Sequence, residues 1–165
     1  MAFDINNHFN IFSCYLRSAS ALHAQGIEAS NKNSACGGGP VVAEYYYITA
    51  LFLYRHTLEL GIKALLKSKT GDDVTGHNIK KLWEAVSNGQ TGISTKIQKA
   101  FAILAKHHIL EDAQLFRYHE DKKGVRLQDM LPIEEESFEV LDQAAWAVYQ
   151  EVCICEHLKK GFPLR

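Results

Sequence analysis

Apolar residues recur every three or four positions along most of the chain, a spacing that predicts amphipathic helices. The first such segment spans about residues 4–25, with Ile5, Phe9, Phe12, Tyr15 or Leu16, Ala19 and Leu22 on one stripe. Gly26 is expected to end this helix. The stretch at about residues 27–40 contains "EASNKNSACGGGP", and its Ser, Asn and Gly content predicts a flexible loop.

Four more segments show helical spacing. The second covers about residues 42–68, between Pro40 and Gly71. A brief third helix, "HNIKKLWEAVSN", ends before Gly89, and a fourth begins near Ser94, a favourable N-cap residue. The fourth covers "TKIQKAFAILAKHH", whose two final histidines, His107 and His108, are expected to cap its C-terminus.

The last helix is expected from Glu135 or Ser137 to about Lys160, where glycine and proline follow. Between the fourth and last helices, residues 116–130 suit a loop or a small hairpin. Because strand-like alternation is otherwise missing, the sequence predicts an all-α bundle of four long helices and one short one. Residues 1–165 are expected to form a single domain.

Composition and charge limit the classes of partner. The chain has 47% hydrophobic and 22% charged residues, as in ordinary globular proteins, and its net charge is −1. No global attraction to nucleic acid or membranes follows, so either partner would have to meet a local patch. Charges interrupt every apolar stretch, so no membrane span is expected. The N-terminus lacks signal-peptide features and the four cysteines lack CxxC spacing, which favours free thiols and a cytoplasmic location.

Four polar residues interrupt the second helix in "LYRHTLELGIKALL", residues 53–66. At about 100° per residue, Glu59, Lys63 and His56 fall near 40°, 80° and 100° from Arg55, on one stripe. The other faces are apolar, which indicates a central helix. The quartet is therefore expected in or beside the core, where Arg55 and Lys63 can both pair with Glu59.

Three interpretations of this quartet stay open. It could be a buried polar network that fixes helix register, or a cleft in which cations and imidazoles meet a phosphate or a scissile bond. A solvated face is a third reading. Further partners could come from His77 or from Arg117, Tyr118 and His119 in "FRYH", and we hypothesise that the quartet and this segment meet in space.

The order of "LYRHTLELGIKALL", "GHNIKKLWEAV" and "LFRYHED" resembles a subgroup of the HEPN superfamily. The resemblance covers about residues 51–85 and 115–119. It implies an up-and-down four- or five-helix bundle, commonly dimeric. Many members are metal-independent RNases of toxin–antitoxin or antiviral systems, and others only bind nucleotides or scaffold partners. A nucleotidyltransferase-type antitoxin is the partner that the toxin–antitoxin reading implies.

Catalytic members carry Arg-x4–6-His near the last helix, and this sequence departs from that pattern. Its one match joins Arg17 to His23 in the first helix, and only one residue separates Arg117 from His119. If the chain cleaves RNA, Arg117 is expected to meet phosphate charge, with His119 or His56 as acid or base. The expected binding residues are Arg55, Glu59, Lys63, His77 and Tyr118.

Eight histidines raise the question of a metal, but the Glu-x-x-His pairs of a di-iron bundle are missing. No metal or other cofactor is therefore expected. A lysine-rich surface around Trp83 suits either RNA or plain solvation; it comprises Lys80, Lys81, Lys96, Lys99 and Lys106. Trp146 and Tyr149 lie off the main stripe of the last helix and form a candidate homodimer face. The sequence therefore leaves two candidate functions. One is an RNA- or nucleotide-binding domain, with or without RNase activity, and the other is a non-catalytic dimeric scaffold.

Overall fold

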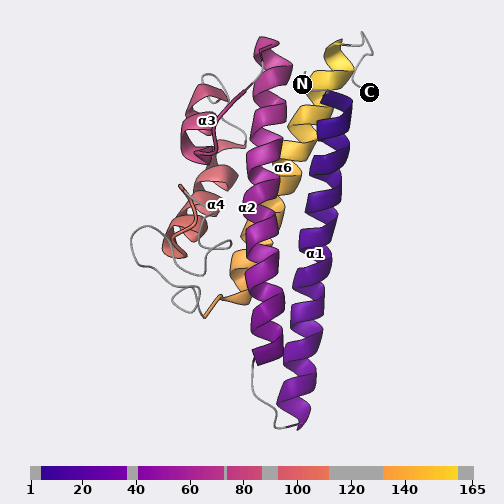
Figure 1. Ribbon diagram of the computed structural model, residues 1–165, viewed down its shortest axis with the longest axis vertical. Helices are drawn as coiled ribbons and strands as arrows, with labels where there is room; N and C mark the ends of the chain where they lie inside the picture. Colours follow the sequence, from indigo (N-terminus) through magenta and orange to yellow (C-terminus); the bar gives the residue numbers. More distant parts are fainter. Residues whose placement is uncertain (1–4, 37–40, 73, 87–92, 112–131, 160–165) are drawn as a thin grey trace.

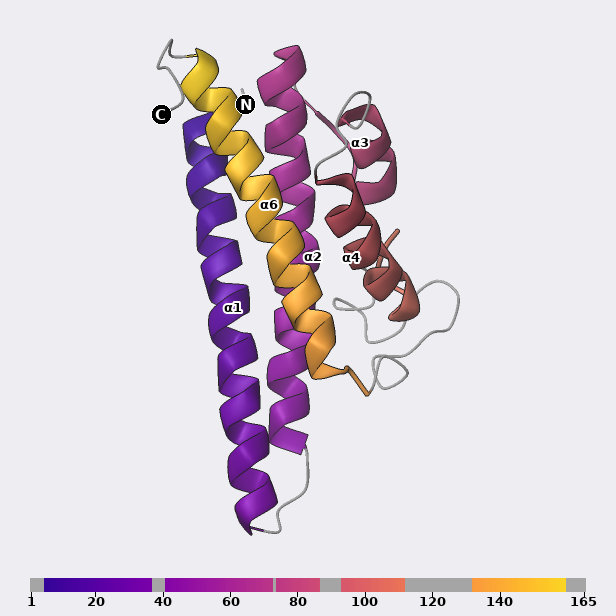
Figure 2. The ribbon, with the colours of Figure 1, turned by 180° about the vertical axis from the view of Figure 1, so that it is seen from behind.

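The computed structural model describes residues 5–36, 41–72, 74–86, 93–111 and 132–159, and all of its regular structure there is helical. The helices are α1 (Ile5–Cys36), α2 (Val41–Thr70), α3 (Ile79–Val86), α4 (Ser94–Lys106) and α6 (Glu135–Lys159). Three long helices, α1, α2 and α6, run side by side, and the two short ones lie on the side of α2 away from α1 (Figures 1 and 2). There α3 packs against α2, and α4 packs against α6. The all-helical prediction is confirmed.

Helix α2 is the central element, since it packs against α1, α3 and α6. Many of its fully buried residues share one face, which is about 120° wide at about 100° per residue: Ala50, Leu51, Tyr54, Leu58, Ile62 and Leu65. One hydrophobic cluster joins these side chains to residues of the other four described helices. Gly71 ends α2 in a left-handed conformation (φ 80°), and its N–H donates to the Lys67 carbonyl, as expected of a C-terminal glycine.

Helix α1 is longer than its sequence predicted. It continues through Gly26 to Cys36, so both the expected stop and the loop over residues 27–36 are wrong. The reason is the closeness of α1 to α2, because a Cβ on Gly26 would lie 2.4 Å from Cε1 of Tyr47. The glycine is needed for this helix contact and does not end the helix. Residues 37–40, the rest of the expected loop, lie outside the described residues.

A second close contact joins the three long helices. A Cβ on Gly61 of α2 would lie 2.8 Å from Cγ1 of Val148 and 2.9 Å from Cζ of Phe12. Nearby, the Tyr54 hydroxyl donates to Asp142 Oδ1 over 2.8 Å, and burial raises the pKa of Tyr54. Ser20 donates to the same oxygen over 2.7 Å, so α1, α2 and α6 share one polar contact within their core.

The short helices begin differently from each other. Asn78 caps α3, because its Oδ1 accepts the Lys81 N–H over 3.1 Å. In α4 the N-cap is Ile93, with no side-chain cap hydrogen bond, so the expected capping role of Ser94 is wrong. His107 occupies the C-cap position of α4 and is buried, and His108 follows with φ 59°.

The expected loop or hairpin at 116–130 lies outside the described residues. The last helix spans Glu135–Lys159, close to its prediction. Among the described helices, none has the length and apolar character that a membrane span requires.

Candidate functional site

A buried carboxylate lies at the centre of the candidate site. Glu59 of α2 is only 2% exposed, and Arg55 and Lys63 lie one turn before and after it on the same helix. Arg55 Nη1 donates to Glu59 Oε2, and Lys63 Nζ donates to Oε1 over 2.8 Å. The i,i+4 spacing read from the sequence therefore places two cations on one carboxylate.

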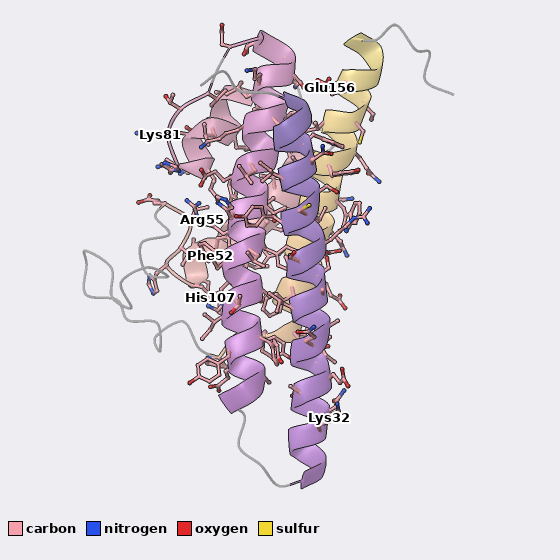
Figure 3. The ribbon with its side chains drawn as sticks, turned by 45° about the vertical axis from the view of Figure 1, so that its right-hand side comes forward. Lys32, Phe52, Arg55, Lys81, His107 and Glu156 are labelled. Atoms are coloured by element: carbon pink, nitrogen blue, oxygen red, sulfur yellow. The ribbon has the colours of Figure 1, made fainter. Side chains whose placement is uncertain are left out.

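Arg55 also connects α2 to two segments that are distant in sequence. Its Nη2 donates to the His77 carbonyl over 2.8 Å, and its Nε donates to the Ile109 carbonyl over 3.2 Å. The planar guanidinium thus holds the start of the α3 region and the chain just after α4 against one helix. Figure 3 shows Arg55 on the side of α2 that carries these short helices. Arg55 is therefore buried and hydrogen-bonded to three groups of the protein.

His77 extends this network to the surface. Its side chain is 82% exposed, yet its Nδ1 lies 2.8 Å from Glu59 Oε1. An ionised carboxylate can only accept hydrogen bonds, so the contact assigns a proton to Nδ1. In the neutral ring Nε2 then carries the free lone pair. A buried charge thereby fixes the tautomer and the orientation of an exposed imidazole.

Burial alone would raise the pKa of Glu59. The hydrogen bond from Lys63, the charge and hydrogen bond of Arg55 and the hydrogen bond from His77 outweigh it and hold this pKa below its ordinary value. Glu59 is therefore a carboxylate at neutral pH, and the site keeps one negative charge between two positive ones.

Acid is expected to remove the stability that Glu59 contributes. Because its folded-state pKa is depressed, this contribution is fully present above the unfolded pKa of about 4.3 and is lost as the pH falls through the folded-state pKa. Urea unfolding of the wild type and Glu59→Gln at pH 7, 5, 4 and 3 measures it. The stability difference between the two proteins should narrow below about pH 4.3. A difference that stays constant down to pH 3 would contradict the prediction.

His56 lies on the same helix but in an aromatic environment. Its ring meets Tyr15 edge-on, with centroids 4.7 Å apart, and lies parallel to Phe52 at 6.1 Å. Burial lowers the pKa of His56, and the positive charges of Arg55 and Lys63 act in the same direction against the opposing Glu59. His56 is therefore a half-buried, neutral ring at pH 7.

The structure brings together four of the predicted binding residues: Arg55, Glu59, Lys63 and His77. Arg117, Tyr118 and His119 lie outside the described residues, so their meeting with the quartet stays a prediction. The sequence did not predict that Arg55 donates to the His77 and Ile109 carbonyls. Every residue has a backbone carbonyl, so the residue types do not show which carbonyl a distant side chain will bind.

Other candidate motifs lie away from this site. In the Arg17-to-His23 match, Arg17 is exposed on α1, whereas His23 stacks on Phe138 with ring centroids 4.6 Å apart. The described part of the chain contains no group of three or more His, Cys, Asp or Glu side chains placed to hold a metal.

Comparison with known proteins identifies the family. Neither curated proteins nor solved structures include a significant match to this chain. The family model described as HEPN domain matches residues 42–151, which are 110 of the 165 residues and include α3, α4, all of α2 except its first residue and most of α6. The match contains the whole Arg55–Glu59–Lys63–His77 site, and we conclude that the chain belongs to the HEPN domain family.

Proposed function

We propose that this HEPN domain binds RNA or a nucleotide at the surface around His77, and that it can cleave RNA without a metal. The observation that carries the proposal is the exposed imidazole held by a buried carboxylate between two cations. An arrangement of this kind presents a directed hydrogen-bonding group to a ligand at the surface.

Positive charge near His77 supports a phosphate as the ligand. Lys80 and Lys81 lie two and three residues after the Asn78 cap and are both exposed. The N-terminus of α3 adds backbone N–H groups and the positive end of its dipole. These groups favour an anion beside the imidazole, although the chain as a whole carries a net charge of only −1.

Residues outside the described part complete the proposal. Arg117 would neutralise phosphate charge and Tyr118 would contact the ligand. For the cleavage reaction the sequence offered His119 or His56 as acid or base. The aromatic packing of His56 makes it the weaker of these two candidates.

Reversal of one charge tests the phosphate-binding surface. Lys81→Glu is expected to weaken binding of a fluorescein-labelled single-stranded RNA and to reduce the salt slope of the binding constant by about one. Fluorescence anisotropy at several salt concentrations measures both quantities. The matched control is Lys32→Glu, because Lys32 is exposed and lies far from Lys81 (Figure 3). Equal losses in the two variants, or no RNA binding by the wild type, would contradict the proposal.

A non-catalytic dimeric scaffold is the second candidate function. Arg55, Glu59 and Lys63 satisfy one another as a structural network would. Trp146 of α6, one residue of the predicted dimer face, is 37% exposed, whereas the other, Tyr149, is partly buried against Phe9 and Phe12 of α1. Ile154 is exposed two turns after Trp146 on the same helix. We propose this face as a homodimer interface, with a nucleotidyltransferase-type antitoxin as a further candidate partner. A dimer in sedimentation that binds no RNA would favour the scaffold over the RNA-binding function.

A further inference from the structure

We infer that one face of α2 is a stacking platform for the bases of single-stranded RNA, formed by the rings of Tyr45, Phe52 and His56. We call these three residues the aromatic row. The inference rests on the proposed RNA binding and goes beyond it, because it adds a site for the bases to the phosphate surface near His77. A platform of this kind accepts many sequences, since every base has a π-face.

Helical spacing places the aromatic row along one side of α2. At about 100° per residue, Phe52, Tyr45 and His56 lie within about 40° of one another around the helix axis. The helical rise separates Phe52 from His56 by about 6 Å and from Tyr45 by about 10.5 Å. Because neighbouring phosphates of one B-form strand are only about 3.4 Å apart along the axis, the row is long enough to contact more than one base.

Packing within the bundle does not account for the outermost ring of the row. Tyr45 is 66% exposed, the highest value among the exposed large hydrophobic side chains of the described residues. Phe52 and His56 are partly buried, and their rings are parallel to within 6°. Tyr15 of α1 meets His56 edge-on and so holds that ring from the side of the bundle. The row therefore combines rings that are fixed by packing with a ring that is open to a ligand.

The aromatic row ends beside the buried carboxylate site. His56 lies three residues before Glu59, and Nδ1 of His77 lies 2.8 Å from Glu59 Oε1. Phe52 and Arg55 are labelled along the same side of α2 in Figure 3. A strand whose phosphates meet the lysines that follow His77 can therefore continue along α2 with its bases on the row.

The neighbouring charges favour RNA over an apolar protein segment as the occupant. Surfaces that bind single strands combine positive charge for the backbone with aromatic rings for the bases. Lys80 and Lys81 supply exposed positive charge at the start of α3, and the aromatic row supplies uncharged rings on the adjoining α2. The two halves of such a surface are thus present on helices that pack against each other.

The first test is Tyr45→Leu, which removes an exposed ring and keeps apolar volume. Its affinity for a fluorescein-labelled single-stranded RNA, measured by fluorescence anisotropy, is expected to fall by about fivefold or more, as for one lost stacking contact. The salt slope of the binding constant should not change, because Tyr45 carries no charge. The matched control is Tyr45→Phe, which keeps the ring and should bind as tightly as the wild type.

The second test uses an abasic ribo-oligonucleotide of the same length, which keeps the sugar and phosphate groups but has no bases. Tyr45→Leu and Phe52→Leu should bind this strand as the wild type does, whereas Lys81→Glu should weaken binding of both strands. Melting temperatures show whether Phe52→Leu, whose ring is partly buried, stays folded. A ring that only supports the fold would not distinguish a strand with bases from one without them.

The possible outcomes separate the inference from the proposed function. Ring variants that bind RNA like the wild type, or that lose affinity equally for the abasic strand, would overturn the inference and leave RNA binding intact. A wild-type dimer that Tyr45→Leu converts to a monomer, with unchanged RNA affinity, would assign the row to a second copy of the chain and would also overturn it. Failure of the wild type to bind RNA would overturn both.

Discussion

Replacement of Glu59 by alanine is expected to destabilise the protein by about 3–5 kcal/mol, because it leaves uncompensated cations in the core. Arg55 is 2% exposed and Lys63 is 9% exposed, and the Glu59 carboxylate accepts hydrogen bonds from both. Water can reach neither cation well enough to replace this carboxylate. Urea unfolding at pH 7, followed by the helical circular-dichroism signal, measures the loss.

The control replaces all three charges together. A triple variant, Arg55→Met, Glu59→Leu and Lys63→Met, should recover much of the stability that Glu59→Ala loses, since it leaves no buried ion without a partner. Recovery should be incomplete, because the Ile109 and His77 carbonyls lose the donors that Arg55 supplies. If the unfolding free energy of Glu59→Ala lay within about 1 kcal/mol of the wild-type value, the prediction would be contradicted. Such a result would indicate that water enters the site and solvates the two cations.

The triple variant also bears on function. Buried ion pairs are weak evidence for stability, since apolar residues of similar volume often serve as well. If the triple variant folds well but no longer binds or cleaves RNA, the polar network is needed because it orients His77. The His77 ring lies at the surface, where packing of the core does not require an imidazole.

The sequence predicted the two ion pairs of Glu59, with Arg55 and with Lys63. The stripe of Arg55, Glu59 and Lys63 follows from helical geometry, and the apolar faces around it require that the charges pair. The role of His77 was harder to predict, since its own segment does not show which ring nitrogen meets a carboxylate 18 residues away. The family resemblance helped because it placed the motif that contains Glu59 and the motif that contains His77 in one fold.

Glycine was the main source of error in the fold. Gly71 and Gly26 each follow a helical pattern, but only Gly71 ends a helix. The difference lies in tertiary contacts, because Gly26 packs against Tyr46 and Tyr47 of another helix. The spacing of residues in the sequence cannot distinguish a glycine that ends a helix from a glycine that allows close packing of two helices. The length of α1 could therefore not be predicted from the sequence.

The short helix α3 should depend on one large side chain. An isolated helix of eight residues is unstable in water, so α3 requires the packing of its buried face. Trp83 is 1% exposed and is the largest residue on that face, which also contains Ile79, Leu82 and Val86. Trp83→Ala is therefore expected to cost about 3–5 kcal/mol in urea unfolding.

This substitution should also weaken RNA binding, although Trp83 is buried and cannot touch a ligand. His77 and Asn78 directly precede α3, so a loosened helix releases the imidazole from Glu59 and misplaces Lys81. Trp83→Phe is the matched control: it keeps a ring in the core and removes an indole N–H that has no hydrogen-bond partner in the described part of the chain. We expect the Phe variant to lose less stability and to retain RNA affinity. If Trp83→Ala bound RNA as tightly as Trp83→Phe under conditions where both are folded, the position of α3 would not control the site, and the ligand would have to bind elsewhere on the bundle.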